Sequence, residues 1–302
     1  MVSVIIPNYN HAPYLTERME SVLGQTYQDF EIIILDDCST DNSREVIERY
    51  RGNSHVSQIV YNEQNSGGVF KQWKKGISLA KGELIWIAES DDKSDPQFLE
   101  TLVRCFTNHG DLVLAFCKSI LFDGKGKTWT MDTEGLEEGK YDSRTFISRF
   151  MSRSCVMLNA SSCLFSKRAF DKIDDIYTTF RASGDYMFWT LISEQGSIAV
   201  IDKRLNHYRK HDTNTTKNGF HTGINQRESK IVMDYIRENN YTTKTQYSQI
   251  RRSFVKKYVF EFIEDPKLKR ELYKYWNFTY TEQLSLRLEA YFNRIKSLFL
   301  RH

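Results

Sequence analysis

The chain has 302 residues, a formal net charge of +3, 40% hydrophobic residues and 27% charged residues. These proportions are typical of a folded globular protein and exclude a disordered chain. No apolar run reaches the roughly 18 residues that a membrane span needs, and no basic segment precedes the apolar start of the chain, so we expect a cytoplasmic protein. The five cysteines form no CxxC pair, which predicts reduced thiols with packing roles.

Apolar runs and helical patterns alternate through the first hundred residues. Short apolar runs predict buried strands that end at polar residues: 2–6, 30–35, 58–61 and 84–88. Helical spacing and capping residues predict the helices between them: 14–25, 43–50 and 69–80. Alternating strands and helices with short turns predict an α/β protein with a mostly parallel sheet, covered by helices on both faces.

The alternation weakens after Pro96. The patterns predict helices at 98–107, 144–151, 167–173 and 186–193, and strands at 112–122, 162–166, 198–201 and 205–208. The segment 125–141 is rich in Gly, Thr and Glu, which predicts a loop or hairpin. We expect residues 1–223 to form one domain with two halves, 1–110 and 111–223.

Residues 224–302 show only helical patterns and form a basic C-terminal region. Residues 243–302 contain 13 Lys or Arg and 6 Asp or Glu, which gives +7, so the first 242 residues carry −4. Near the end, apolar residues recur at spacings of three and four and alternate with basic ones: Leu284, Leu288, Phe292, Ile295, Leu298 and Phe299 with Arg287, Arg294, Lys296 and Arg301. This amphipathic helix predicts either peripheral contact with an anionic membrane surface or packing on protein, including a second subunit. Its aromatic residues follow the helical stripe and do not favour nucleic-acid binding.

Pairs of acidic residues follow two of the predicted strands. Asp36 and Asp37 follow the second strand, and Asp91 and Asp92 follow the fourth. Because the carboxyl ends of parallel strands share one sheet edge, these carboxylates should lie close together, where they repel one another unless a cation offsets them. Oxygen ligands of this kind suit Mg²⁺ or Mn²⁺, which can also bridge phosphates. The alternative is an Asp-rich turn in which Asp95 caps a helix.

The acidic pair after the second strand also points to a class of ligand. A carboxylate at this position suits hydrogen bonding to a base or ribose. The chain contains neither the GxGxxG fingerprint nor a Walker GxxxxGK[ST] segment. Bound phosphates would therefore be neutralised mainly by metal and basic side chains, which favours a sugar nucleotide over NAD or ATP.

Five segments follow one another between residues 2 and 211: VSVIIPNYN, SVLGQTYQDFEIIILDDCSTDNS, NSGG, AKGELIWIAESDD and SGDYMFW. Their order resembles the family 2 glycosyltransferases, which are inverting enzymes of the GT-A fold. The resemblance implies a hexosyl- or N-acetylhexosaminyltransferase that uses a nucleoside-diphosphate sugar, with UDP favoured, and Mn²⁺ or Mg²⁺. It also implies an acceptor hydroxyl on a glycan or lipid-linked molecule, in the biosynthesis of a polysaccharide such as a capsule or O-antigen.

The resemblance further implies roles for individual residues. It assigns nucleotide binding to Pro7, Tyr9, Asp36, Asp37, Lys71 and Asp91, and metal binding to Asp92 and His211. Asp185 matches the family's catalytic base, although Ser183-Gly184-Asp185 also suits a helix N-cap. The source of positive charge near the phosphates stays open between Lys71, Lys74 and Lys75.

The chain departs from the family pattern in three places. After the NxG turn, where members often have an Arg-Asn pair, it has Gln72-Trp73-Lys74-Lys75. The QxxRW motif of processive synthases is missing after Asp185, which favours a transferase that adds a single sugar. Glu89 and Ser90 replace the more usual Asp-Ser or Asp-Ala, so the metal would depend on Asp92 alone. The alternatives are a catalytically inactive module that binds sugar nucleotides and a nucleotidyltransferase. The loop 8–13 lacks the glycine and basic residues that a nucleotidyltransferase needs.

Overall fold

A computed structural model describes the backbone of residues 1–210 and 215–299, and the side chains of residues 1–210 and 219–292. The chain divides into two compact units, Met1–Asn214 and Thr215–His302. The sequence predicts this boundary at residue 223, and helix α8 (Thr215–Thr222) accounts for the difference. In that helix Phe220 stacks on Tyr258 of the second unit, with ring centroids 5.2 Å apart.

The first unit is built on a mixed sheet with the strand order β3-β2-β1-β4-β9-β6-β10-β5. Its N-terminal half contains four parallel strands: β1 (Val2–Asn8), β2 (Phe30–Asp36), β3 (Val56–Tyr61) and β4 (Leu84–Ile87). These strands match the first four predicted apolar runs. β1, β2 and most of β4 are buried because helices cover both faces of the sheet, whereas β3, at the sheet edge, is mostly half-buried.

In the second half of the sheet, the strand beside β4 runs in the reverse direction. β9 (Cys163–Ser166) pairs antiparallel with both β4 and β6 (Leu112–Asp123), and β10 (Ser197–Lys210) runs parallel to β6. Two successive reversals restore the original direction, so β1, β2, β4, β6 and β10 all place their carboxyl ends at the same edge. The predicted strands 198–201 and 205–208 form the single strand β10, whose pairing with β6 shifts register between Ile201 and Asn206.

Short strands complete the sheet. β7 (Thr128–Thr130) pairs with β6 as a hairpin, and β8 (Gly139–Tyr141) pairs with β10, so the segment 125–141 contains both strand and loop. β5 (Lys93–Ser94) pairs antiparallel with β10 directly after the acidic turn that follows β4.

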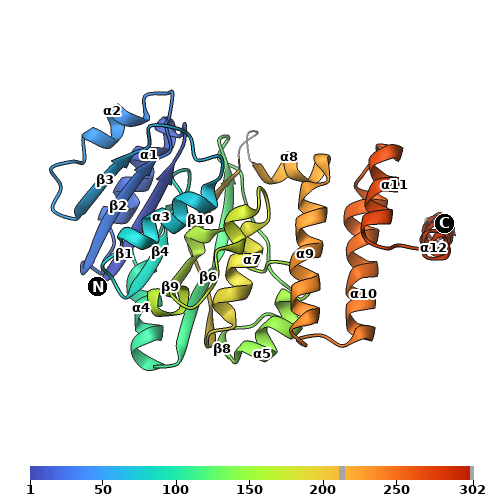
Figure 1. The fold of residues 1–302 in the computed structure, drawn as a ribbon. Coiled ribbons are helices and arrows are strands. Elements are labelled where there is room, and N and C mark those ends of the chain that lie inside the picture. The colour runs from blue at the N-terminus through green and yellow to red at the C-terminus, as the bar shows by residue number, and fades with distance from the viewer. Residues whose placement is uncertain (211–214, 300–302) are drawn as a thin grey trace. The chain divides into compact units, whose positions relative to one another are not determined.

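Helices cover the two faces of the sheet (Figure 1). On one face, apolar residues of the strands form a core with α1 (Ala12–Leu23), α2 (Ser43–Glu48) and α4 (Phe98–Asn108). On the other face, α3 (Val69–Leu79) lies so close to β1 that a Cβ at Gly76 would be 2.3 Å from Ile5 Cγ2. Trp73 of α3 packs on Phe188 of α7 (Gly184–Ser193), with ring centroids 5.5 Å apart. The shorter α5 (Ser143–Phe146), with its π-helical continuation Ile147–Met151, and α6 (Lys167–Phe170) complete this unit.

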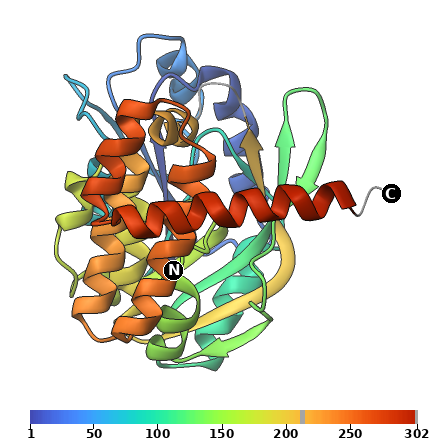
Figure 2. The same cartoon turned by 90° about the vertical axis from the view of Figure 1, so that its right-hand side faces the viewer.

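The second unit is helical. After α8 it contains α9 (Ile224–Glu238), α10 (Lys244–Val255) with a π-helical continuation Lys256–Glu261, α11 (Pro266–Tyr275) and α12 (Tyr280–Phe299). Its core joins Phe254 and Val259 to Leu272, Trp276 and Leu286. Figure 2 shows α12 crossing over α10, to which it is tied by ion pairs of Glu282 and Glu289. Among the described residues, no helix combines the length and apolar character needed to cross a bilayer.

Candidate active site

The carboxyl edge of the sheet gathers the polar residues that the sequence singled out. Asp36 ends β2 and Asp37 follows it, the turn 89–92 follows β4, Asp185 lies in the first turn of α7, and β10 ends at Lys210. Their proximity is electrostatic as well as topological. The pKa of Glu89 is raised well above its ordinary value by burial and by the charges of Asp91, Asp92 and Asp185. The structure therefore brings three separate elements to one acidic site.

Asp37 is held by a dense set of donors and is only 5% exposed. Its Oδ1 accepts hydrogen bonds from Asn62 Nδ2 at 2.6 Å, from the backbone N–H of Ser66 at 2.8 Å and from Gln72 Nε2 at 2.9 Å. Its Oδ2 accepts from Ser66 Oγ at 2.7 Å. Three donors share the lone pairs of Oδ1, whereas Oδ2 accepts a hydrogen bond from Ser66 Oγ alone, so Oδ2 is the oxygen with room for a ligand donor.

Asp36, the last residue of β2, bonds to the end of β1 and to the turn that follows β2. Its Oδ1 accepts from Asn8 Nδ2 at 2.8 Å and from Ser39 Oγ at 2.6 Å, and its Oδ2 accepts from the Ser39 backbone N–H at 3.0 Å. Pro7 is buried in β1, whereas the Tyr9 side chain is 47% exposed. Of these three predicted nucleotide-binding residues, Tyr9 therefore presents the largest open surface.

The Asp92 carboxylate is occupied by protein donors. Its Oδ1 accepts from the Arg209 backbone N–H at 2.9 Å, and its Oδ2 accepts from Ser161 Oγ at 2.7 Å and from Asn159 Nδ2. Only 1% of the residue is exposed, and burial together with the charge of Asp91 raises the pKa of Asp92 to about 7. The resemblance implies that this residue binds the metal, but in the structure its carboxylate joins three segments of the chain through hydrogen bonds. Asp91, its half-buried neighbour, has the more open position.

The residues present fit a cation only in part. Among residues 1–210 and 219–292, no group of three or more His, Cys, Asp or Glu is arranged to hold a metal ion. Mg²⁺ and its relatives are often held by only one or two carboxylates, with substrate phosphates and water completing the shell. The acidic turn is compatible with that mode. His211, the second predicted ligand, lies outside the described residues.

Asp185 lies in the first turn of α7. The helix starts at Gly184 with Ser183 at the N-cap position, and Asp185 Oδ1 accepts from the backbone N–H of Tyr186 at 2.8 Å. The N-cap alternative therefore does not describe this residue. A Cβ at Gly184 would lie 2.5 Å from the Phe70 ring and 2.7 Å from the Tyr177 carbonyl oxygen, so the glycine lets the helix start come close to α3.

The lysines of α3 differ in their partners. Lys71 is exposed, and its Nζ donates to the Ser66 carbonyl at 2.9 Å, beside the Asp37 cluster. Lys74 pairs with Asp175, and Lys75 donates to Asn62. Within the described part of the chain, Lys74 and Lys75 therefore donate to side chains, whereas Lys71 donates to a backbone carbonyl.

A further cation lies at the end of β10. Lys210 Nζ lies 3.9 Å from the centre of the Tyr208 ring, and the Lys210 side chain is half-buried. Burial lowers the pKa of Lys210, while the negative charges of Asp92 and Asp91 oppose that shift. Sequence reasoning gave this residue no role, although it lies next to the predicted His211.

Sequence reasoning also missed the residues that support the acids. Asn62, Ser66 and Gln72 orient Asp37, while Arg18 and Ser161 surround Asp92. Only Arg18 leaves a signal in the sequence. It is a charged residue within the otherwise apolar buried stripe of α1, which also contains Leu15, Met19 and Val22.

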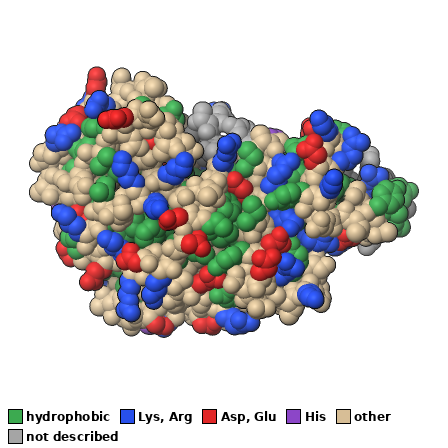
Figure 3. Space-filling model, viewed as in Figure 1, with side chains coloured by type: hydrophobic (Ala, Val, Ile, Leu, Met, Phe, Trp, Pro, Cys, Tyr) green, Lys and Arg blue, Asp and Glu red, His purple; other side chains and the backbone are tan. Residues whose placement is uncertain are grey.

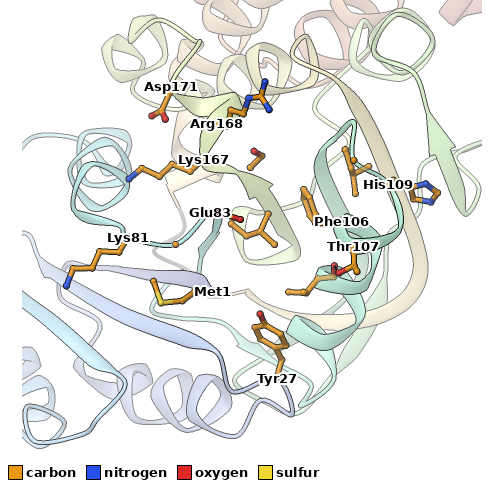
Figure 4. Close-up of a pocket in the computed structure, with 16 residues that line it drawn as sticks. Met1, Tyr27, Lys81, Glu83, Phe106, Thr107, His109, Lys167, Arg168 and Asp171 are labelled. Carbon is orange, nitrogen blue, oxygen red and sulfur yellow. Dashed lines mark hydrogen bonds between the residues drawn. The ribbon is translucent and has the colours of Figure 1, made fainter.

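A pocket of about 710 Å³ lies at the opposite, amino edge of the sheet (Figure 4). It is lined by residues around the starts of β4 and β6, with Lys81, Lys167 and Arg168 beside Glu83 and Asp171. Its lining of mixed charge has no predicted site residue. The acidic edge is therefore the candidate active site, and this pocket is separate from it.

Fold and site together define an α/β protein with an acidic ligand site at the carboxyl edge of its sheet. Residues 3–174 match the family model of glycosyl transferase family 2, and the chain belongs to that family.

Two sequence relatives show how far the likeness extends. An uncharacterized glycosyltransferase of Nostoc sp. is 31% identical over 218 residues, covering 70% of this chain and 66% of that protein. The Staphylococcus aureus poly(ribitol-phosphate) β-N-acetylglucosaminyltransferase TarS is 34% identical over 141 residues, covering 45% of this chain and 24% of that protein. This chain therefore spans less than two thirds of the length of either relative.

Solved structures extend the likeness to the fold. S. aureus TarS 1–349 in complex with UDP-GlcNAc superposes with a TM-score of 0.68 at 19% identity, covering 91% of this chain and 79% of that one. The mannosyltransferase PcManGT of Pyrobaculum calidifontis, in complex with GDP-Man and Mn²⁺, gives 0.58 at 13% identity, covering 96% and 79%. The expected GT-A fold is confirmed.

Proposed function

We propose that this chain is a metal-dependent inverting glycosyltransferase. It moves one sugar at a time from a nucleoside-diphosphate sugar to a hydroxyl of a glycan or lipid-linked acceptor, in polysaccharide biosynthesis. The observation that carries the proposal is that Asp37 follows β2 and Asp91 follows β4 at one sheet edge, where the charge of Asp185, in the first turn of α7, contributes to raising the pKa of Glu89 in the same turn as Asp91. Family membership and the UDP-GlcNAc complex of TarS support a UDP-sugar as donor.

Asp37 recognises the base. Its carboxylate is fixed by donors on Oδ1, and Oδ2 can accept one more hydrogen bond. An acceptor in this position selects bases that carry a ring N–H, such as uracil, thymine and guanine, over adenine and cytosine. Lys71 and Tyr9 would contact the nucleotide, because an exposed cation suits phosphate and an exposed aromatic ring suits the base or ribose.

Asp91, rather than Asp92, is the carboxylate that holds the cation. The oxygens of Asp92 already accept hydrogen bonds from three protein donors, whereas Asp91 is half-buried at the same turn. His211 is the second candidate ligand. When bound, Mg²⁺ or Mn²⁺ would neutralise negative charge on the diphosphate leaving group.

Lys210 supplies further positive charge for the diphosphate. It lies half-buried at the end of β10, where the negative charges of Asp92 and Asp91 oppose the lowering of its pKa by burial. A cation in a partly desolvated site stabilises a charged leaving group more than the same cation in water does.

Asp185 acts as the general base. Its carboxylate accepts the proton of the acceptor hydroxyl as that oxygen forms a bond to the anomeric carbon of the donor sugar. The bond from this carbon to the diphosphate oxygen breaks in the same displacement, and its electron pair leaves with the nucleoside diphosphate. A single displacement inverts the anomeric centre and needs no covalent intermediate on the enzyme.

Two experiments test the proposal. The first is calorimetric titration with UDP, GDP and dTDP, each in the presence of Mn²⁺ and of chelator. The second measures the release of nucleoside diphosphate from sugar nucleotides in the presence of a panel of acceptors. We expect one nucleotide to bind in a metal-dependent way and its sugar conjugate to be turned over. Binding without turnover across the panel would favour the alternative of an inactive sugar-nucleotide-binding module. No binding of any nucleotide would overturn the donor assignment.

We also propose that α12 brings the protein to an anionic membrane surface. Tyr280, Leu288 and Phe292 are 72%, 49% and 58% exposed, and Figure 3 shows hydrophobic side chains at the surface of this end of the second unit. Glu282 and Glu289 point to the other side of the helix, where they pair with basic residues of α10 and its continuation. An apolar face with Arg287 beside it suits anionic lipid.

Flotation with vesicles of anionic lipid tests this placement. Leu288→Glu with Phe292→Glu should abolish flotation without loss of folding, because both side chains are exposed, while Leu286 keeps its place in the core. Wild-type protein that does not float but forms dimers in light scattering would assign the face to a second subunit.

A further inference from the structure

Arg18 is a completely buried arginine whose position no catalytic step requires. It lies on α1 with 0% exposure, between the apolar residues Leu15, Met19 and Val22. A buried charge costs free energy unless it is paired and hydrogen-bonded. The partners of the guanidinium group therefore indicate why it is there.

Those partners bracket the acidic turn that follows β4. Arg18 Nε donates to the Glu89 carbonyl oxygen at 2.8 Å, and Nη1 donates to Ser94 Oγ at 3.2 Å. Nη2 lies 3.9 Å from Asp92 Oδ2. A single planar group thus contacts the first residue of the turn, its buried acid and the last residue of β5.

Ser161 links the same guanidinium to the same turn from another element. Arg18 Nη2 donates to Ser161 Oγ at 3.2 Å, and this hydroxyl accepts from the Glu89 backbone N–H at 3.0 Å while it donates to Asp92 Oδ2 at 2.7 Å. Trp86, at the other side of the network, donates its ring N–H to the Ser161 carbonyl at 2.9 Å. The contacts fix the backbone on both sides of Asp91.

We propose that Arg18 is a positioning residue that sets the conformation of the turn 89–94 and thereby the direction of Asp91. This inference rests on the proposed function for its catalytic consequence, but the geometry it describes does not. Arg18 is fully buried, so it touches neither donor nor acceptor. The planar fork of an arginine suits this role because its donors leave in fixed directions, which the single ammonium group of lysine cannot reproduce.

Hydrogen exchange read by mass spectrometry measures the turn directly. In Arg18→Lys, deuterium uptake of a peptide covering 89–94 should rise at least fivefold at early times, while a β2 peptide covering 30–36 stays at the wild-type rate. Arg104→Lys is the matched control, because that arginine is exposed on α4 and forms an ion pair with Glu100 of the same helix. Global loss of stability would raise uptake in both peptides, so a local rise separates positioning from general weakening.

Titration with Mn²⁺ in the presence of UDP gives the second readout. We expect Arg18→Lys to raise the half-saturating Mn²⁺ concentration at least tenfold, while UDP affinity in chelator changes less than twofold. Arg18→Met should have a larger effect in the same direction. If the arginine variants do not fold, Ser94→Ala removes one contact of the guanidinium and should raise uptake of 89–94 at least twofold.

The two ideas fail in different ways. Wild-type protein that binds no nucleotide would defeat the proposed function, and the exchange experiment would still decide the role of Arg18. Unchanged uptake of 89–94 in folded Arg18→Lys, or in folded Ser94→Ala where the arginine variants do not fold, would overturn the positioning role. An unchanged Mn²⁺ requirement in Arg18→Lys, with wild-type binding intact, would overturn its extension to Asp91.

Discussion

Ser66 donates hydrogen bonds to both carboxylate oxygens of Asp37: its hydroxyl donates to Oδ2 at 2.7 Å and its backbone N–H donates to Oδ1 at 2.8 Å. The loop before α3 thereby orients a carboxylate that ends β2. A carboxylate held on both oxygens by a neighbouring loop loses little freedom when a ligand binds, so binding of the proposed base to Asp37 would carry a smaller entropy cost.

Asp37→Asn should weaken UDP binding by about 10- to 100-fold, because a hydrogen bond to a charged acceptor contributes about 1.5 to 3 kcal/mol. Calorimetry in chelator isolates this contact from the metal. Asp175→Asn is the control, since Asp175 is exposed and pairs with Lys74. Equal affinities of Asp37→Asn and wild type would place the base elsewhere.

Asp185→Asn should lower kcat by about 10² to 10⁴, the usual contribution of a general base, and leave UDP affinity unchanged. The amide keeps the size of the side chain but cannot take the acceptor proton. Initial rates of nucleoside diphosphate release measure the effect, and Asp171→Asn, at the opposite sheet edge, is the matched control. Turnover near the wild-type rate would exclude Asp185 as the base.

Asp91→Asn should impair metal binding, whereas Asp92→Asn should impair folding stability. Asp91→Asn should keep the wild-type melting temperature and lose the Mn²⁺ dependence of UDP binding. Asp92→Asn should lower the free energy of unfolding by about 1 to 3 kcal/mol. The new amide N–H₂ group would face Asn159 Nδ2 and Ser161 Oγ, which donate hydrogen bonds to the carboxylate in the wild type. Denaturant titration and calorimetry separate the two. A stable Asp92→Asn that has lost only metal dependence would restore Asp92 as the ligand.

Gly184→Ala should lower the free energy of unfolding by about 1 to 3 kcal/mol through overpacking. The added Cβ would meet the Phe70 ring at 2.5 Å and the Tyr177 carbonyl oxygen at 2.7 Å. Since Asp185 is the next residue, kcat should fall too. Gly110→Ala is the control because a Cβ there meets nothing within 4 Å. Equal stability of the two variants would contradict the close approach of α7 to α3.

Thiol reactivity should follow burial. Burial raises the pKa of Cys117 to about 12 and raises that of Cys163 as well, so both remain protonated at pH 8 in the folded protein. A maleimide reagent at pH 8 should leave both unmodified, react at the half-exposed Cys38, and reach the buried pair only in denaturant. Peptide mapping of the labelled protein identifies the sites. Modification of Cys117 at the rate of Cys38 would contradict its place in the sheet.

The sequence by itself determined the strands of residues 1–110 and the acids at or just after their ends. Apolar runs and their polar ends are properties of a few consecutive residues, so the strand ends Asp36 and Asp91–Asp92 and the start of α7 could be located without tertiary contacts. The parallel direction of the first strands then placed these acids at one edge. Joining 198–201 to 205–208 as one strand could not be foreseen, because the register shifts depend on pairing with β6.

Only the tertiary structure decided the surroundings of each acid. Asp92 and Asp91 are adjacent in the sequence and of the same type, but Asp92 is enclosed by Ser161 and the backbone of Arg209, which are 69 and 117 residues away. The choice among the lysines depended likewise on partners elsewhere in the fold, such as Asp175 for Lys74. Burial and hydrogen bonding set the charge and the accessibility of a carboxylate, and these come from residues that folding brings together, so no local pattern encodes them.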